Sequence, residues 1–216
     1  MKKGLTELVF IVDMSGSMAD MRADTIGGIN TVLADQRKDK DEVLVSTVVF
    51  NNRSYVVHDR IPLTQVPDMT EADYSPRGCT ALLDAVGDAI HHIGNVHKYI
   101  REEDVPEKTV FVITTDGMEN ASSRYSGTDV RAMVEQKKET CGWEFLFLAA
   151  NLDAAETAAG MGIDRSRAVN YHNDARGNAV KFGAASVAVK YLKRDISLDE
   201  RPSWRAEADK DFETRR

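Results

Sequence analysis

Cysteine, proline and long apolar runs are all scarce in this chain of 216 residues, which contains two cysteines and five prolines. Cys79 and Cys141 provide neither a disulfide framework nor a Cys-x-x-Cys metal motif, so we expect reduced thiols and a cytoplasmic location. No apolar run reaches the length needed to cross a membrane. Glu7 interrupts the first apolar stretch after the Met-Lys-Lys start, so we expect no signal peptide either.

Clustered positive charge is also missing. The 28 Lys and Arg residues are outnumbered by 35 Asp and Glu residues, which gives a formal net charge of −7. Because nucleic-acid binding requires concentrated positive charge, we expect no nucleic-acid partner. A hydrophobic content of 42% is ample for the core of one domain of this length.

The stretch 8–12 is a short apolar run that ends abruptly at Asp13, and Ser15, Gly16 and Ser17 follow. This pattern predicts a strand buried on both faces, with one carboxylate and two hydroxyls at its end. Taken alone, these side chains suit a hard metal ion or the cap of a following helix equally well. A calcium loop of the helix-loop-helix type is excluded, because Met18 and Asp24 stand where that loop needs glycine and glutamate.

Two further stretches favour the metal interpretation. Residues 109–115 form a second β-branched and aromatic run, and Asp116-Gly117 ends it. Thr80 follows Gly78 at the start of a helical pattern. Carboxylate and hydroxyl oxygens suit Mg²⁺, Mn²⁺ or Ca²⁺ and suit softer metals poorly.

These three stretches resemble the von Willebrand factor type A (vWA) domain with its metal-ion-dependent adhesion site (MIDAS), over roughly residues 5–194. The family pattern is Asp-x-Ser-x-Ser, a distant Thr and a further Asp-Gly. It falls here on Asp13, Ser15, Ser17, Thr80 and Asp116. The resemblance implies a bound Mg²⁺, with Mn²⁺ as an alternative and Ca²⁺ less favoured.

In the family, the hydroxyls that match Ser15, Ser17 and often Thr80 contact the metal, while Asp13 and Asp116 act mostly through water. One coordination position stays open, and the resemblance implies that an Asp or Glu of a protein partner fills it. Intracellular members act in larger assemblies, so a multi-component complex is implied. Many relatives work outside cells, so the expected cytoplasmic location departs from theirs.

Alternating strand and helix patterns predict an α/β fold: a doubly wound, mostly parallel central sheet with one antiparallel edge strand and helices on both faces. This domain is expected to span residues 1–194. Residues 195–216 are expected to form a charged C-terminal tail outside the core, with Trp204 either attached to the domain or exposed. The expected strands are 8–12, 43–50, 55–57, 109–115, 143–149 and 168–171, and the expected helices are 18–38, 80–99, one from 129, 154–159 and 175–194.

The main alternative function is a Mg²⁺-dependent phosphatase or hydrolase in which Asp13 is the nucleophile. Such enzymes place a second Asp two residues later, where this chain has Ser15. A nucleotide-binding loop is also incomplete, because Arg165 stands where Gly160 and Gly162 would need a third glycine. We therefore expect a binding module and no enzymatic activity.

Other candidate residues receive more ordinary interpretations. The three histidines His91, His92 and His97 share no helix face at metal-binding spacing, so we expect them on the surface. Cys79 is expected to be a small buried residue. Further along the chain, Glu119 and Asn120 are expected at the rim of the site, where they would meet a partner, and Asp153 is expected to cap a helix.

Overall fold

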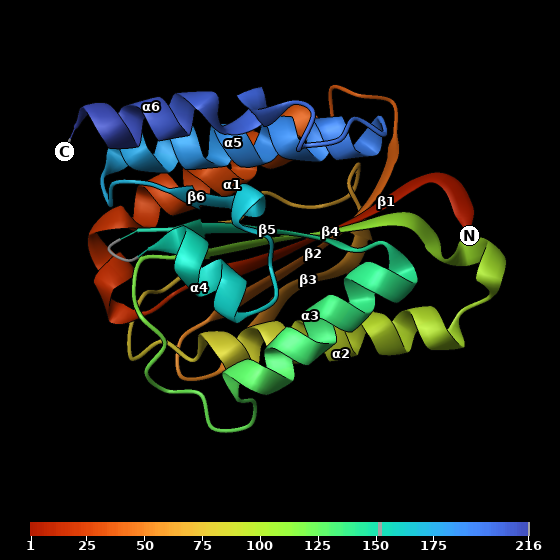
Figure 1. Ribbon diagram of the computed structural model, residues 1–216, viewed down its shortest axis with the longest axis horizontal. Coiled ribbons are helices and arrows are strands. Elements are labelled where there is room, and N and C mark those ends of the chain that lie inside the picture. Colours follow the sequence, from red (N-terminus) through yellow and green to blue (C-terminus); the bar gives the residue numbers. More distant parts are fainter. Residues whose placement is uncertain (151–152, 216) are drawn as a thin grey trace.

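A six-stranded sheet runs through the middle of the computed structural model, which describes residues 1–150 and 153–215 (Figure 1). Its strand order is β3-β2-β1-β4-β5-β6, and all neighbours are parallel except β2 and β3. The strands are β1 (Lys2–Asp13), β2 (Glu42–Phe50), β3 (Ser54–Pro62), β4 (Pro106–Thr115), β5 (Glu144–Ala149) and β6 (Ala168–Asn170). The predicted fold class, including the antiparallel edge strand, is confirmed.

Strand β1 lies between β2 and β4 and separates the two halves of the core. Leu8, Phe10 and Val12 join the hydrophobic cluster on one face of the sheet, and Val9 and Ile11 join the cluster on the other. This division follows from the two-residue period of a strand. Both faces are covered, which is why the run is apolar at every position from 8 to 12.

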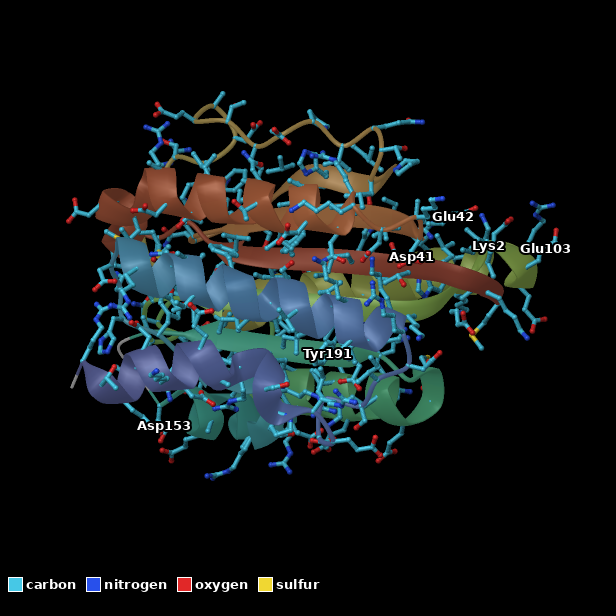
Figure 2. All side chains as sticks on the ribbon, turned by 90° about the horizontal axis from the view of Figure 1, so that it is seen from above. Lys2, Asp41, Glu42, Glu103, Asp153 and Tyr191 are labelled. Atoms are coloured by element: carbon cyan, nitrogen blue, oxygen red, sulfur yellow. The ribbon has the colours of Figure 1, made fainter. Side chains whose placement is uncertain are left out.

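Helices cover both faces of the sheet (Figure 1). One face carries α1 (Arg22–Gln36), α5 (Ala175–Lys193) and α6 (Ala206–Thr214), which lie side by side when seen from above (Figure 2). The other face carries α2 (Leu82–Tyr99), α3 (Gly127–Cys141) and α4 (Ala154–Gly160). Short 3-10 segments are η1 (Gly16–Met21), η2 (Glu102–Asp104), η3 (Arg165–Arg167) and η4 (Pro202–Arg205).

The predicted first helix begins later than expected, because residues 16–21 form η1 and α1 starts at Arg22. Within α1, Gly28 lies directly against the ring of Phe182 on α5. A Cβ atom at Gly28 would lie 2.0 Å from Cδ2 of Phe182, whereas one at Gly27 would meet nothing within 4 Å. Gly28 therefore sets how closely these two helices approach.

Residues 195–215 pack onto the domain, so the expectation that the tail lies outside the core is wrong. Leu198, Trp204 and Ala208 are buried in the same cluster as α1 and α5. The charged residues between them form ion pairs, such as Arg167 with Asp199 at 2.7 Å. The high charge of the segment concealed an apolar face that covers α5. Within the described part of the chain, no helix combines the length and apolar character needed to cross a membrane.

Candidate metal centre

The strand order reverses between β1 and β4, and this reversal brings their carboxyl ends together. Val12 pairs with Thr114, so Asp13 and Thr115 are neighbours across the two strands. Thr115 donates a hydrogen bond from Oγ1 to Oδ2 of Asp13 at 2.6 Å. The ends of parallel strands at such a reversal are the usual ligand-binding edge of this kind of sheet.

A chain of hydrogen bonds links four of the five predicted site residues. The backbone N–H of Ser15 donates to Oδ1 of Asp13 at 2.7 Å, and the hydroxyls of Ser15 and Ser17 are 3.1 Å apart. Ser17 donates from Oγ to Oδ1 of Asp116 at 2.6 Å. The oxygens of these residues therefore converge on one point at the edge of the sheet.

Thr80, the fifth residue, is brought to the same place by a glycine turn. Gly78 has φ +77°, and a Cβ atom there would lie 2.2 Å from Oδ1 of Asn52, so any other residue would strain the backbone and displace the Asn52 side chain. Gly16 donates from its backbone N–H to the carbonyl of Gly78 at 3.0 Å. A Cβ atom at Gly117 would lie 3.8 Å from the Thr80 hydroxyl and 4.0 Å from the Ser17 hydroxyl.

The loop after Asp116 is tied to the start of α2. Glu119 accepts hydrogen bonds from the backbone N–H groups of Leu83 and Ala121 at 3.0 and 2.9 Å. Asn120 accepts from the backbone N–H of Thr80 at 2.9 Å. Glu119 therefore holds this loop and the start of α2 in one arrangement.

Burial governs the electrostatics of the site. Asp13, Ser15, Thr80 and Asp116 are all at most 3% exposed, whereas Ser17 is exposed and forms the open side of the cluster. Burial raises the pKa of Asp13, with a smaller contribution from the charge of Asp116, although hydrogen bonds from Thr115 and Ser15 oppose the shift. The free site therefore holds its negative charge at a cost, which a cation would relieve.

The donor set fits a hard divalent ion. Ligand oxygens of an octahedral Mg²⁺ at about 2.1 Å from the ion lie about 3.0 Å apart, close to the 3.1 Å between the two serine hydroxyls. Among the residues that the structure describes, no three His, Cys, Asp or Glu side chains gather into a metal-binding group, so any ion here would depend on hydroxyl oxygens as well. The geometry therefore suits a divalent ion held by carboxylates and hydroxyls.

Several residues that organise the cluster were missed by sequence reasoning. Thr115 holds Asp13, and Asn173 donates from Nδ2 to Oδ2 of Asp116 at 2.9 Å. Tyr171 donates from its hydroxyl to the carbonyl of Thr115 at 3.1 Å, and Tyr74 donates to the carbonyl of Asp13 at 2.5 Å. The sequence could have indicated Thr115, because it directly precedes the Asp-Gly pair at the end of its strand. The other three come from distant segments with no local motif.

Two of the ordinary interpretations need correction. Cys79 is exposed, because the Gly78 turn directs its backbone N–H to Asn52 and leaves its side chain in solvent. His97 is largely buried and lies 2.6 Å from the carboxylate of Glu7, whose other oxygen accepts from Arg60 at 2.7 Å. The Glu7 side chain is fully buried, so the residue that interrupts the first apolar run is a buried partner of two basic side chains.

Three other interpretations agree with the structure. His91 and His92 are exposed, as expected. Asp153 caps α4 by accepting a hydrogen bond from the backbone N–H of Glu156 at 2.9 Å. The expected hairpin joins β2 and β3, and Asn51 accepts from the backbone N–H of Arg53 within the turn.

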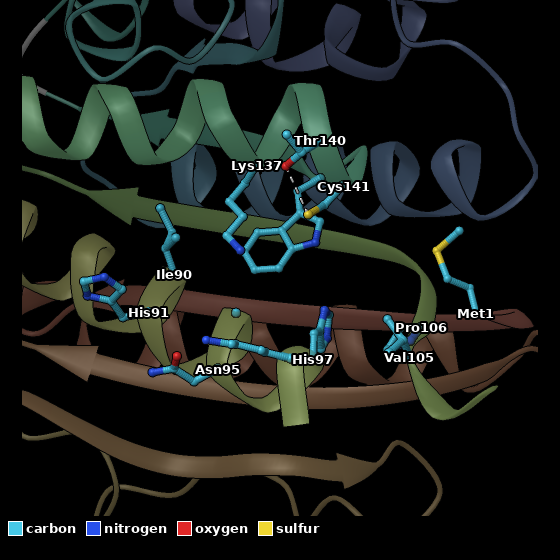
Figure 3. A pocket seen from close by; sticks show the side chains of 13 residues that line it. Met1, Ile90, His91, Asn95, His97, Val105, Pro106, Lys137, Thr140 and Cys141 are labelled. Carbon is cyan, nitrogen blue, oxygen red and sulfur yellow. Dashed lines mark hydrogen bonds between the residues drawn. The ribbon is translucent and has the colours of Figure 1, made fainter. Parts of the chain in front are cut away.

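A sizeable groove lies away from these residues, between α2 and α3 (Figure 3). Its volume is about 470 Å³, and Trp143 forms part of its lining. None of the five candidate metal residues lines it. The chemistry at the strand ends therefore belongs to a separate part of the surface.

No protein-family profile matches this chain, and no curated protein matches it. Solved structures do share its fold. They include the pilus adhesin SpaC of Lactobacillus rhamnosus GG (TM-score 0.65, 12% identity, 88% of this chain and 30% of that chain). Proximal thread matrix protein 1 of the mussel byssus, with a zinc-occupied MIDAS motif, has a TM-score of 0.60 and 10% identity, over 84% of this chain and 47% of that chain.

A von Willebrand factor type A protein of Catenulispora acidiphila has a TM-score of 0.54 and 14% identity, over 86% of this chain and 42% of that chain. This chain spans less than half the length of each of these three proteins. At these identities the likeness concerns the fold, which is that of a vWA domain.

Proposed function

We propose that this chain is a divalent-metal-dependent protein-binding module, in which an Asp or Glu of a protein partner completes the coordination of Mg²⁺ or Mn²⁺. Ser15, Ser17 and Thr80 would hold the ion through their hydroxyls, with Asp13 and Asp116 balancing its charge. The zinc-occupied MIDAS of the mussel protein, which shares the fold, supports a divalent ion at this edge. A bound divalent ion supplies positive charge and an open coordination position.

The observation that carries the proposal is the convergence of oxygens from three stretches far apart in the sequence. Ser17 and Asp116 are 2.6 Å apart, and Thr80 lies beside the same Gly117 as Ser17. Two carboxylates nearly balance a divalent ion, yet the hydroxyls are neutral ligands. An ion held this way stays attractive to a further carboxylate.

The surface next to the cluster suits a protein partner. Met118 follows Gly117 and is 73% exposed, which makes it one of the few large hydrophobic side chains on the surface of the described residues. Exposed Ser17 and Gly16 lie on the open side of the cluster. A carboxylate that reaches the metal would thus be flanked by an apolar contact, an arrangement typical of binding sites.

The structure offers nothing in favour of Asp13 as a phosphatase nucleophile. Both oxygens of its carboxylate accept hydrogen bonds, from Ser15 and Thr115, and the residue is 0% exposed. A nucleophile has to reach its substrate. We therefore propose a module with no turnover of its own, which works in the cytoplasm as part of a multi-component complex.

The test combines metal binding with partner capture. Titration calorimetry of the metal-free protein with MgCl₂ should show one binding site, which Asp116→Ala removes and Asp20→Asn retains. Asp20 is an exposed carboxylate on η1 and serves as the matched control. Pull-downs from native cell extract should capture a protein with Mg²⁺ present, and lose it with EDTA or with Asp116→Ala. Capture that is insensitive to both would contradict the proposal.

A further inference from the structure

Lys181 on α5 is fully buried, although nothing in the candidate metal centre requires a lysine. Its side chain is 0% exposed, and its ammonium forms no hydrogen bond within the part of the chain that the structure describes. The nitrogen lies 4.0 Å from the centroid of the Tyr171 ring and 4.9 Å from that of Phe182. An ammonium buried without an acceptor is costly, so its position calls for a physical explanation.

The charged groups that act on Lys181 are the two carboxylates of the candidate metal centre. Burial lowers the pKa of Lys181 to about 7, and the charges of Asp116 and Asp13 act in the opposite direction. Tyr171 connects the two regions, because its ring lies against the ammonium and its hydroxyl donates to the carbonyl of Thr115. The lysine therefore lies behind the oxygen cluster, on the side closed to solvent.

Among the residues that the structure describes, Asp116 and Asp13 are the two whose charges shift the pKa of Lys181. α1 contributes Gly28, which lies against the neighbouring Phe182. α6 contributes the buried Asp211, but its carboxylate lies 2.6 Å from Arg176 and 2.9 Å from Arg215. Tyr74 and Tyr171 both have a raised pKa, mainly through burial, so they add no negative charge.

We propose that the Lys181 ammonium is an internal counter-charge that competes with the divalent ion for the field of Asp13 and Asp116, and so sets the metal affinity of the site. In the metal-free protein the ammonium partly balances the two carboxylates. When the ion enters, the same ammonium repels it. This role rests on the proposed metal-binding function. The ammonium makes the site bind the ion more weakly than its ligands alone would.

The experiment measures the Kd for Mg²⁺ of the metal-free full chain by titration calorimetry at pH 6.0 and pH 9.0. The variants are Lys181→Met, which keeps the length and removes the charge, and Lys190→Met, a control on the same helix. Lys181→Gln serves if the methionine variant fails to fold. The informative quantity is the ratio of the Kd values of parent and variant at each pH.

At pH 6.0, where the ammonium is charged, Lys181→Met should bind Mg²⁺ at least about tenfold more tightly than the parent protein. At pH 9.0 the ratio should fall below about twofold, because the parent lysine is then neutral. Altered packing alone would give the same ratio at both pH values.

A ratio near one at pH 6.0, or the same ratio at both pH values, would overturn this role for Lys181 while leaving the metal site in place. Absence of Mg²⁺ binding in the parent protein would overturn the proposed function, and with it this inference. Lys190→Met should match the parent protein throughout.

Discussion

Ser17 and Asp116, which are 99 positions apart in the sequence, are joined by a hydrogen bond of 2.6 Å at the carboxyl edge of the sheet. This contact exists because β1 and β4 are neighbours although β2 and β3 intervene along the chain. It joins the exposed and the buried parts of the oxygen cluster. It also identifies the residue whose removal tests the cluster most directly.

Replacing Asp116 by alanine should abolish Mg²⁺ binding and leave the free energy of unfolding within about 1 kcal/mol of the parent value. The change removes one of two carboxylates, which reduces the attraction for a cation. Ser17 and Asn173 each lose the hydrogen bond that they donate to Asp116. In compensation, the change removes the negative charge that helps to raise the pKa of Asp13. Calorimetry and urea denaturation measure the two effects, and Asp20→Asn is the control. A folded variant that binds Mg²⁺ as the parent does would exclude Asp116 from the site.

Thr80→Ala should weaken Mg²⁺ binding by roughly tenfold without abolishing it, because it removes one neutral ligand and no charge. The backbone N–H of Thr80 keeps its bond to Asn120, so the turn should stay in place. The parent protein should have the lowest Kd for Mg²⁺ and Thr80→Ala a higher one, whereas binding to Asp116→Ala should be too weak to detect. Equal effects of the two substitutions would indicate that Thr80 acts by shaping the loop.

Met118→Asp should reduce capture of the metal-dependent partner by about tenfold or more while leaving the Kd for Mg²⁺ within about twofold. The new carboxylate removes an apolar contact and repels the acidic group of the partner. Tyr99→Asp, at an equally exposed hydrophobic on α2, should leave capture unchanged. If both substitutions have the same effect, Met118 lies outside the interface.

Gly28→Ala should destabilise the protein by about 1–3 kcal/mol, because the added methyl group collides with the Phe182 ring. Gly27→Ala, one position earlier, meets no atom within 4 Å and should stabilise α1 by up to about 1 kcal/mol. Urea denaturation of the pair measures both changes. The opposite signs at adjacent glycines would establish helix packing as the cause.

Lys181→Met should raise the free energy of unfolding at pH 6 by a few kcal/mol in EDTA, and the gain should shrink as the pH approaches 10. The pKa of Lys181 is lowered to about 7 from 10.5, so the unfolded chain binds more protons between these values. The free energy of unfolding of the parent protein therefore rises with pH between about 7 and 10.5. Below pH 7 the full cost of burying the charged ammonium remains. Denaturation at several pH values measures the difference; a gain that is independent of pH would contradict the shift.

The sequence by itself determined the chemistry at the strand ends and the fold class. The apolar run before Asp13, the hydroxyls of Ser15 and Ser17, and the Asp-Gly pair at Asp116 are local patterns, since a strand and its end are read from consecutive residues. The alternation of strands and helices was sufficient to predict the doubly wound sheet. The Asn51 turn was sufficient to predict its antiparallel edge.

Only the tertiary structure decided which distant residues meet these groups. Thr115 reaches Asp13 through strand register, and Asn173 and Lys181 arrive from a segment that follows the last strand. Glu7, which looked like an interruption, is buried because His97 and Arg60 come from α2 and β3. The Trp204 side chain is buried in the core because the charged segment that contains it folds back onto α5. Such pairings depend on strand order and helix packing, which place residues together regardless of their separation along the chain.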